Sequence, residues 1–115
     1  MCHLFAGQPA ENFAYETRSV RLGGHSTSVR LEAAFWRTLE EMAEAQGTSL
    51  AKFLTILHDE FLEVHGEAHN FTSLLRCACL TYSDVVKGNE SVTNELRAKT
   101  AIAISESEDH YLRAG

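Results

Sequence analysis

This chain has little of what marks secreted, membrane or fibrous proteins. Its 115 residues include one proline, three cysteines and no apolar run long enough for a signal peptide or a membrane span. A small, odd number of cysteines is not the framework of a disulfide-stapled domain and favours a reducing compartment. We therefore expect a cytoplasmic protein that does not associate with membranes.

Basic residues are scarce as well. Ten lysines and arginines against sixteen acids give a net charge of −6, which argues against a protein that coats nucleic acid through bulk charge. The basic residues are unevenly spread, because residues 17–37 hold four arginines and a single acid. That segment could present a local cationic surface to phosphate, or its arginines could be ordinary solvated residues.

An alternating pattern over residues 17–31 predicts a β-hairpin. The runs TRSVRL and HSTSVRL flank Gly23-Gly24, which is a typical two-residue hairpin turn. This turn sets Leu22 opposite His25 and Ser19 opposite Ser28, so that polar and apolar residues separate onto two faces. The predicted inner face carries Val20, Leu22, Thr27, Val29 and Leu31, and the predicted outer face carries Ser19, Arg21, Ser26, Ser28 and Arg30.

Helices are predicted after the hairpin, from apolar residues at three- and four-residue spacing. Glycines mark the ends of the first two helices, and small polar residues are placed to cap the second and third. The predicted helices cover residues 32–46, from Thr48 or Ser49 to Gly66, 71–82 behind an Asn70 cap, and, weakly, 92–104.

The expected fold is therefore mainly helical with a short β element, a hairpin followed by three helices. An apolar content of 44% is enough for one domain of this length to bury a core. We expect an N-terminal arm over residues 1–16, a folded domain over 17–82, and a partly helical C-terminal tail over 83–115.

A metal site is the first chemistry to weigh, because Cys77-x-Cys79 lies in the same half of the chain as three histidines. Residues two apart on a helix point about 200° away from each other, so the two thiols cannot ligate one ion. Small thiols in a helix more often fill a core. The three histidines are His58, His65 and His69. We expect no metal and no cofactor, and keep a thiol or metal sensor as a minor alternative.

Two catalytic arrangements also have to be weighed. Loss of Met1 would leave Cys2 as a terminal nucleophile, but 115 residues are too few for the layered fold that such enzymes use. Adjacent acids such as Asp59-Glu60 point apart on a helix and fit a solvated face. We expect no enzyme activity.

The order of strand, helix, glycine-containing turn and helix resembles the ribbon-helix-helix DNA-binding proteins. The segment TSVRLEAAFWRTLEEMA at residues 27–43 is similar to their strand and first helix. More narrowly, the Met-Cys start, TRSVRL, and NFTSLLRCACLTY at residues 70–82 resemble small bacterial ribbon-helix-helix proteins. Some of those proteins carry an arylsulfate sulfotransferase-like name, and nothing in this chain resembles a sulfotransferase.

The resemblance implies a homodimeric, sequence-specific transcriptional regulator whose β-ribbon enters the DNA major groove. Outward residues of the ribbon would reach base edges, and arginine suits guanine because its planar fork matches O6 and N7. A helix N-terminus would anchor phosphate through its free N–H groups. The implied contacts are Arg30, Ser28 and Ser26, with Arg21 and Ser19 as a second row, and Thr48, Ser49 and Lys52 at the phosphate anchor. Asn70, Thr72, Ser73 and Arg76 offer a second such anchor.

The alternative function is a protein–protein interaction module that keeps the fold without binding DNA. Such a module would hold a protein partner through its acidic helices. Salt-dependent retention on DNA discriminates between the two, because phosphate contacts release counterions.

Overall fold

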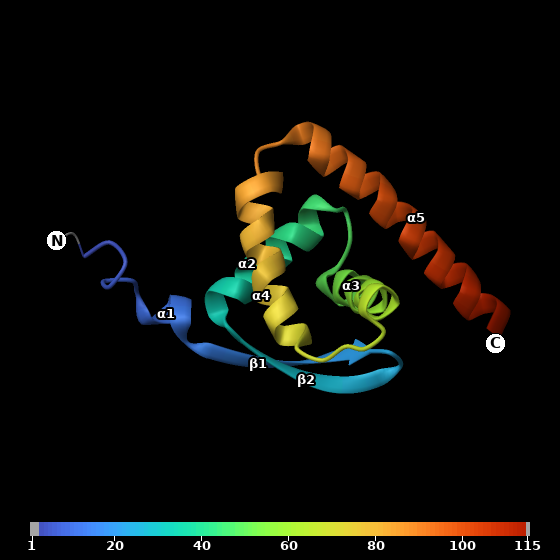
Figure 1. Ribbon diagram of the computed structural model, residues 1–115, viewed down its shortest axis with the longest axis horizontal. Coiled ribbons are helices and arrows are strands. Elements are labelled where there is room, and N and C mark those ends of the chain that lie inside the picture. Colours follow the sequence, from blue (N-terminus) through green and yellow to red (C-terminus); the bar gives the residue numbers. More distant parts are fainter. Residues whose placement is uncertain (1–2, 115) are drawn as a thin grey trace.

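A long β-hairpin lies across one side of a group of helices (Figure 1). The computed structural model describes residues 3–114, with side chains described as far as residue 108. A short segment precedes the hairpin, and a long C-terminal helix runs past the others. The elements are α1 (Ala10–Phe13), β1 (Tyr15–Leu22), β2 (His25–Glu32), α2 (Ala33–Ala45), α3 (Leu50–His65), α4 (Phe71–Thr81), the π-helical turn η1 (Tyr82–Val86) and α5 (Glu90–Ala114).

The predicted hairpin register is confirmed. β1 and β2 are antiparallel, with Leu22 opposite His25 and Ser19 opposite Ser28. Gly23 and Gly24 have φ angles of 59° and 82°. A two-residue turn between twisted strands requires such positive angles, which residues other than glycine rarely adopt. The turn is therefore the local cause of the register.

The register also confirms the predicted inner face of the hairpin, although one of its residues is exposed. Leu31 is fully buried and Val29 is 4% exposed, so both form part of the core. Thr27 lies on this same face, opposite Val20, but it is exposed. It borders a depression of about 370 Å³ beside His58 and Phe71, because the hairpin tip extends over an unfilled gap next to α3 and α4.

Helix α2 fixes the hairpin from the inside. Trp36 is fully buried, and its Nε1 donates a hydrogen bond to the Glu16 carbonyl of β1 at 2.9 Å. Arg18 lies over the Trp36 ring at 4.7 Å and pairs with Glu40. Leu39 of α2 is buried in the same cluster as Trp36 and Leu31, so one face of α2 and the inner face of the hairpin share a single core.

Helices α3 and α4 close the other side of the core through Leu54 and Leu75, both fully buried. Ser49 caps α3, since its hydroxyl accepts from the Lys52 N–H at 3.2 Å. Asn70 is the residue before α4, as predicted, but its φ of 63° is left-handed and its side chain makes no capping bond.

The described segments on either side of the predicted domain hold more regular structure than the sequence predicts. The residues expected to form an arm contain α1 and the start of β1, and the Ala33 N–H donates to the Ala14 carbonyl at 2.8 Å. The tail forms the 25-residue helix α5 instead of a weak segment near residues 92–104. No helix in the described part of the chain has the length and apolar character needed to cross a membrane.

Candidate nucleic-acid interface

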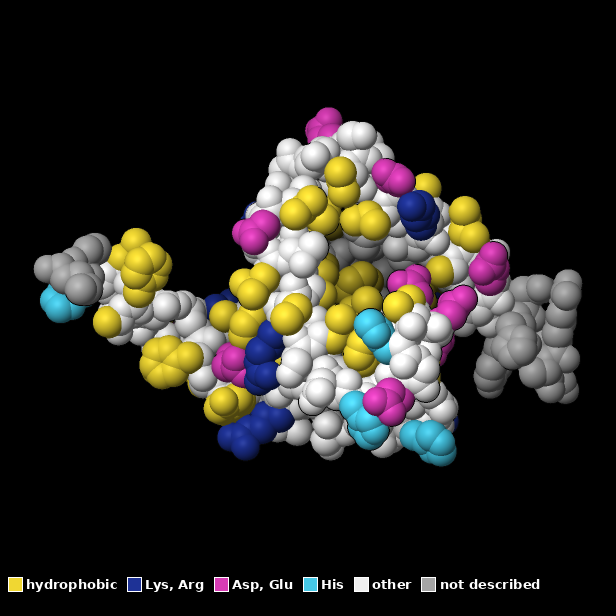
Figure 2. Space-filling view, viewed as in Figure 1, with side chains coloured by type: hydrophobic (Ala, Val, Ile, Leu, Met, Phe, Trp, Pro, Cys, Tyr) yellow, Lys and Arg dark blue, Asp and Glu magenta, His cyan; other side chains and the backbone are white. Residues whose placement is uncertain are grey.

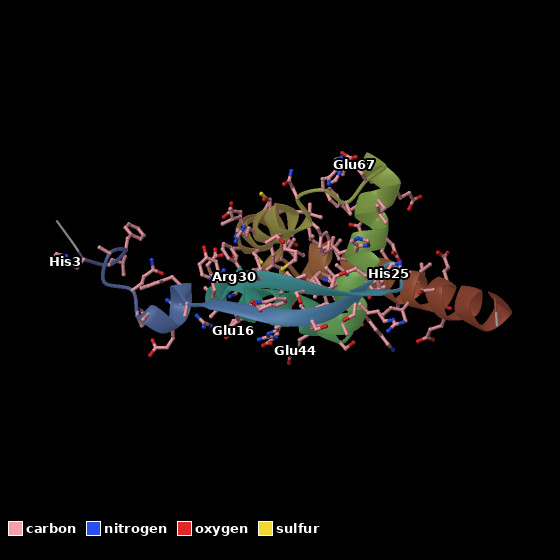
Figure 3. All side chains as sticks on the ribbon, turned by 90° about the horizontal axis from the view of Figure 1, so that it is seen from below. His3, Glu16, His25, Arg30, Glu44 and Glu67 are labelled. Atoms are coloured by element: carbon pink, nitrogen blue, oxygen red, sulfur yellow. The ribbon has the colours of Figure 1, made fainter. Side chains whose placement is uncertain are left out.

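The outer face of the hairpin gathers the residues that the sequence assigns to base contact. Ser19, Arg21, Ser26, Ser28 and Arg30 are all exposed and project from the same side of the two strands. The Ser19 and Ser26 hydroxyls lie 2.8 Å apart across the hairpin. Figure 3 looks onto this side of the molecule, with Arg30 labelled on β2. We call the side of the hairpin that carries these five residues the outer face.

The arginines of the basic segment differ in whether a partner already holds them. Arg18 is held by Glu16 and Glu40, and Arg37 reaches the Asn12 side chain. By contrast, Arg21 and Arg30 form no ion pair with any carboxylate in the described residues. The two guanidinium groups on the outer face are thus the ones left available to an external anion.

Tyr15 is an outer-face residue that the sequence analysis missed. The Arg30 guanidinium lies over its ring, 4.3 Å from the centroid, and Tyr15 is 56% exposed. Stacking on an aromatic ring orients the planar fork of arginine. The signal was present, because the polar alternation of the outer face continues back from Ser19 through Thr17 to Tyr15.

The backbone of Arg30 is held on both sides by buried neighbours. Val29 and Leu31 flank it in the core. Two residues further on, Glu32 accepts two hydrogen bonds from Arg76 of α4, at 2.7 and 3.1 Å. This contact lowers the pKa of the Glu32 carboxyl and raises the pKa of Arg76. The strand carrying Arg30 is therefore clamped where it passes into α2.

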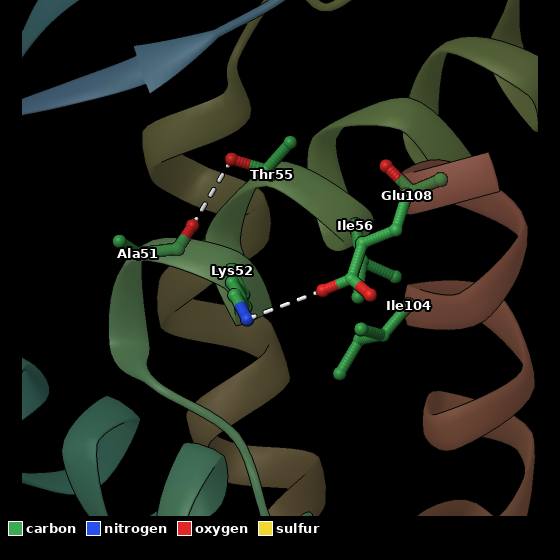
Figure 4. A pocket seen from close by; sticks show the side chains of 7 residues that line it. Ala51, Lys52, Thr55, Ile56, Ile104 and Glu108 are labelled. Carbon is green, nitrogen blue, oxygen red and sulfur yellow. Dashed lines mark hydrogen bonds and ion pairs between the residues drawn. The ribbon is translucent and has the colours of Figure 1, made fainter. Parts of the chain in front are cut away.

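At the N-terminus of α3, the predicted phosphate anchor is already partly occupied. Ser49 uses its hydroxyl as the cap, the Thr48 hydroxyl is buried without a hydrogen-bond partner among the described residues, and Lys52 pairs with Glu108 of α5 at 3.4 Å (Figure 4). The first N–H groups of α3, at Leu50 and Ala51, have no partner within the helix. An anion at this end would meet those two groups and would compete for Lys52.

The anchor at α4 is less suited to phosphate. Arg76 is engaged by Glu32, and Thr72 lines the depression under the hairpin tip.

Cys77 and Cys79 lie on different sides of α4: Cys77 is exposed, whereas Cys79 is buried and its thiol donates to the Phe35 carbonyl. Burial raises the pKa of Cys79 to about 11. Cys2 lies outside the described residues.

With this geometry in place, the comparisons with known proteins identify the family. The ribbon-helix-helix domain family matches residues 15–83, from the start of β1 to the beginning of η1, and the chain belongs to that family. Among solved structures it is similar to an uncharacterized protein from Bordetella pertussis Tohama I. The two share 43% identity with a TM-score of 0.69.

This match covers 71% of the present chain and 66% of the Bordetella protein, just under two thirds of its length. No curated protein gives a significant match.

Proposed function

We propose that the chain is a sequence-specific DNA-binding transcriptional regulator with a non-enzymatic role. It acts through the outer face of the hairpin, placed in the major groove. The observation that carries the proposal is the pair of arginines on that face, Arg21 and Arg30, which have no carboxylate partner in the described residues. Membership of the ribbon-helix-helix family supports it.

The shape of the hairpin suits the groove. The major groove of B-DNA, roughly 12 Å wide, admits a two-stranded β-ribbon, and each base pair shows a distinct pattern of donors and acceptors there. Serine hydroxyls can donate or accept, and the arginine fork matches guanine. The N–H groups at the start of α3, with Lys52, would meet a flanking phosphate.

We further propose that the protein works as a homodimer. The strand that the resemblance pairs across a dimer, β2, is paired along its length with β1 of the same chain. The two-stranded sheet still leaves the outer edge of each strand without a partner strand in the described residues, and such edges favour pairing with a second chain. Phe5 and Phe13, 80% and 60% exposed, add apolar surface for a second chain to cover. Sedimentation at micromolar concentration should give a dimer, and a monomer would contradict this part of the proposal.

The salt dependence of DNA binding tests the function itself. The affinity for a duplex should fall steeply with salt, because each phosphate contact releases counterions. Replacing both Arg21 and Arg30 by alanine should reduce the slope of log K against log salt by about one, because Arg21 meets phosphate whereas Arg30 reads a base. Arg37→Ala removes one positive charge from α2, away from the outer face, and should leave the slope unchanged.

A chain that is not retained on immobilised DNA at low salt would overturn the proposal. It would favour the interaction module, in which the acidic helices hold a protein partner.

A further inference from the structure

A hollow of about 430 Å³ lies between α2, α3, α4 and α5, on the helical side of the molecule. Figure 2 looks into it between α4 and α5, with hydrophobic side chains on its floor. The apolar lining includes Met42, Phe53, Leu57, Leu74 and Leu96. Its volume lies within the range of roughly 300–1,000 Å³ that small-molecule sites occupy, and an apolar lining with a few polar groups is typical of them.

One largely buried polar residue lines this hollow and keeps an amide donor that no described protein group accepts. Gln46 is 7% exposed and lines the cavity. Its Oε1 accepts from the Thr100 hydroxyl at 3.1 Å, while its Nε2 donates to no side chain or carbonyl of the described residues. This donor is open to the hollow, so an oxygen atom of a ligand could accept from it in place of solvent.

The charged residues that line the hollow bear on how a charged ligand would be oriented in it. Lys99 also lines it and directly precedes Thr100, the residue whose hydroxyl donates to Gln46. Lys99 pairs with Glu95, but both side chains are well exposed and such a pair is weak. Glu60, the acid in the lining, lies two turns of α3 beyond Phe53, about 10 Å along the helix and away from Gln46.

The wall of the hollow includes an unusual backbone segment. Tyr82 and Val86, the first and last residues of the π-helical turn η1, both line it. Single π-helical turns are rare and often occur at functional sites. This feature is independent of the free donor on Gln46.

We infer that this hollow binds a small apolar molecule ending in a carboxylate. The carboxylate accepts from Gln46 Nε2 and lies near Lys99, and the apolar part fills the space along Phe53, Leu57 and Leu74. The inference stands apart from DNA binding and uses none of the outer-face residues.

Titration with sodium octanoate, followed by the side-chain amide signal of Gln46 in a ¹⁵N–¹H spectrum, tests the inference. The signal should shift and saturate. Octylamine, with the same chain and a cationic head, should bind at least roughly tenfold more weakly. Gln46→Leu should weaken octanoate binding by roughly tenfold, the loss of one hydrogen bond to a charged acceptor.

Two substitutions that fill the hollow complete the test. Ala78→Phe on α4 and Thr81→Trp at the exposed rim should both abolish binding, and Ala98→Phe on the exposed side of α5 is the matched control. Circular dichroism checks that each variant is folded, and the rim position keeps the test decisive if Ala78→Phe unfolds.

An unshifted Gln46 signal, equal binding of octylamine, or binding that survives in a folded filled variant would overturn the inference. So would the same shifts appearing on raising protein concentration without octanoate, since a second copy of the chain would then occupy the hollow.

Discussion

Alanine substitutions at adjacent residues of β2 should differ widely in their cost to stability, and Leu31→Ala is the sharper test. Leu31 is fully buried between the hairpin and α2, in the cluster that holds Trp36 and Leu39. Truncating a buried leucine costs about 2–5 kcal/mol, from lost transfer free energy and from the cavity that remains. A small domain has roughly 5–15 kcal/mol of stability, so this is a large share. Arg30→Ala on the same strand loses only an exposed contact with Tyr15, about 1 kcal/mol or less.

Urea denaturation followed by circular dichroism measures both variants against the parent. Leu31→Ala should lower the free energy of unfolding by at least about 2 kcal/mol, with an unchanged dependence on urea. Equal effects of the two substitutions, or a loss below about 1 kcal/mol for Leu31→Ala, would refute the assignment of the two faces.

Three further predictions concern the contacts around this core. Arg76 lowers the pKa of Glu32, so their ion pair contributes stability above about pH 4.5, and this stability is lost as the pH falls through the lowered pKa. Glu32→Gln should reduce the free energy of unfolding at pH 7 by about 1–3 kcal/mol and flatten its fall in acid. Denaturation curves across pH that coincide for the parent and the variant would contradict this prediction. Cys77 is exposed and should react with iodoacetamide at pH 8 in the folded protein, whereas Cys79 should stay unmodified until unfolding, because burial raises its pKa to about 11. Peptide mass mapping measures both, and equal labelling of the two thiols would contradict the burial of Cys79. Glu108→Gln removes the ion-pair partner of the lysine at the start of α3 and should strengthen DNA binding about two- to fivefold at low salt, whereas an unchanged affinity would show that this lysine meets no phosphate.

The hairpin and the helices were predictable because local chemistry determines them. The Gly23-Gly24 turn fixes the register by itself, and strict alternation along both strands then assigns each side chain to a face. Thr27 lies on its predicted face but stays exposed, because alternation gives the direction of a side chain and not what packs against it, and here the tip projects over a gap.

The C-terminal helix and the partners of the arginines were not predictable in the same way. Helix α5 has almost no amphipathic pattern, since only a few of its residues, such as Val92 and Leu96, touch the core. Periodicity therefore gave a weak signal for a helix that is long. Contacts such as Lys52 with Glu108 and Arg76 with Glu32 join residues more than forty apart, and only the fold brings them together.

The measurement closest to the central claim compares Arg30→Ala and Arg21→Ala on two duplexes at fixed salt. One duplex is the site that the parent selects from a random pool, and the other is a scrambled sequence of equal length. Arg30 is clamped and stacked on Tyr15, so its loss should cost about 1–3 kcal/mol on the selected duplex and little on the scrambled one. Arg21→Ala should weaken both duplexes about equally. A folded Arg30→Ala variant that discriminates the two duplexes as well as the parent does would contradict the claim that the outer face of the hairpin reads DNA sequence.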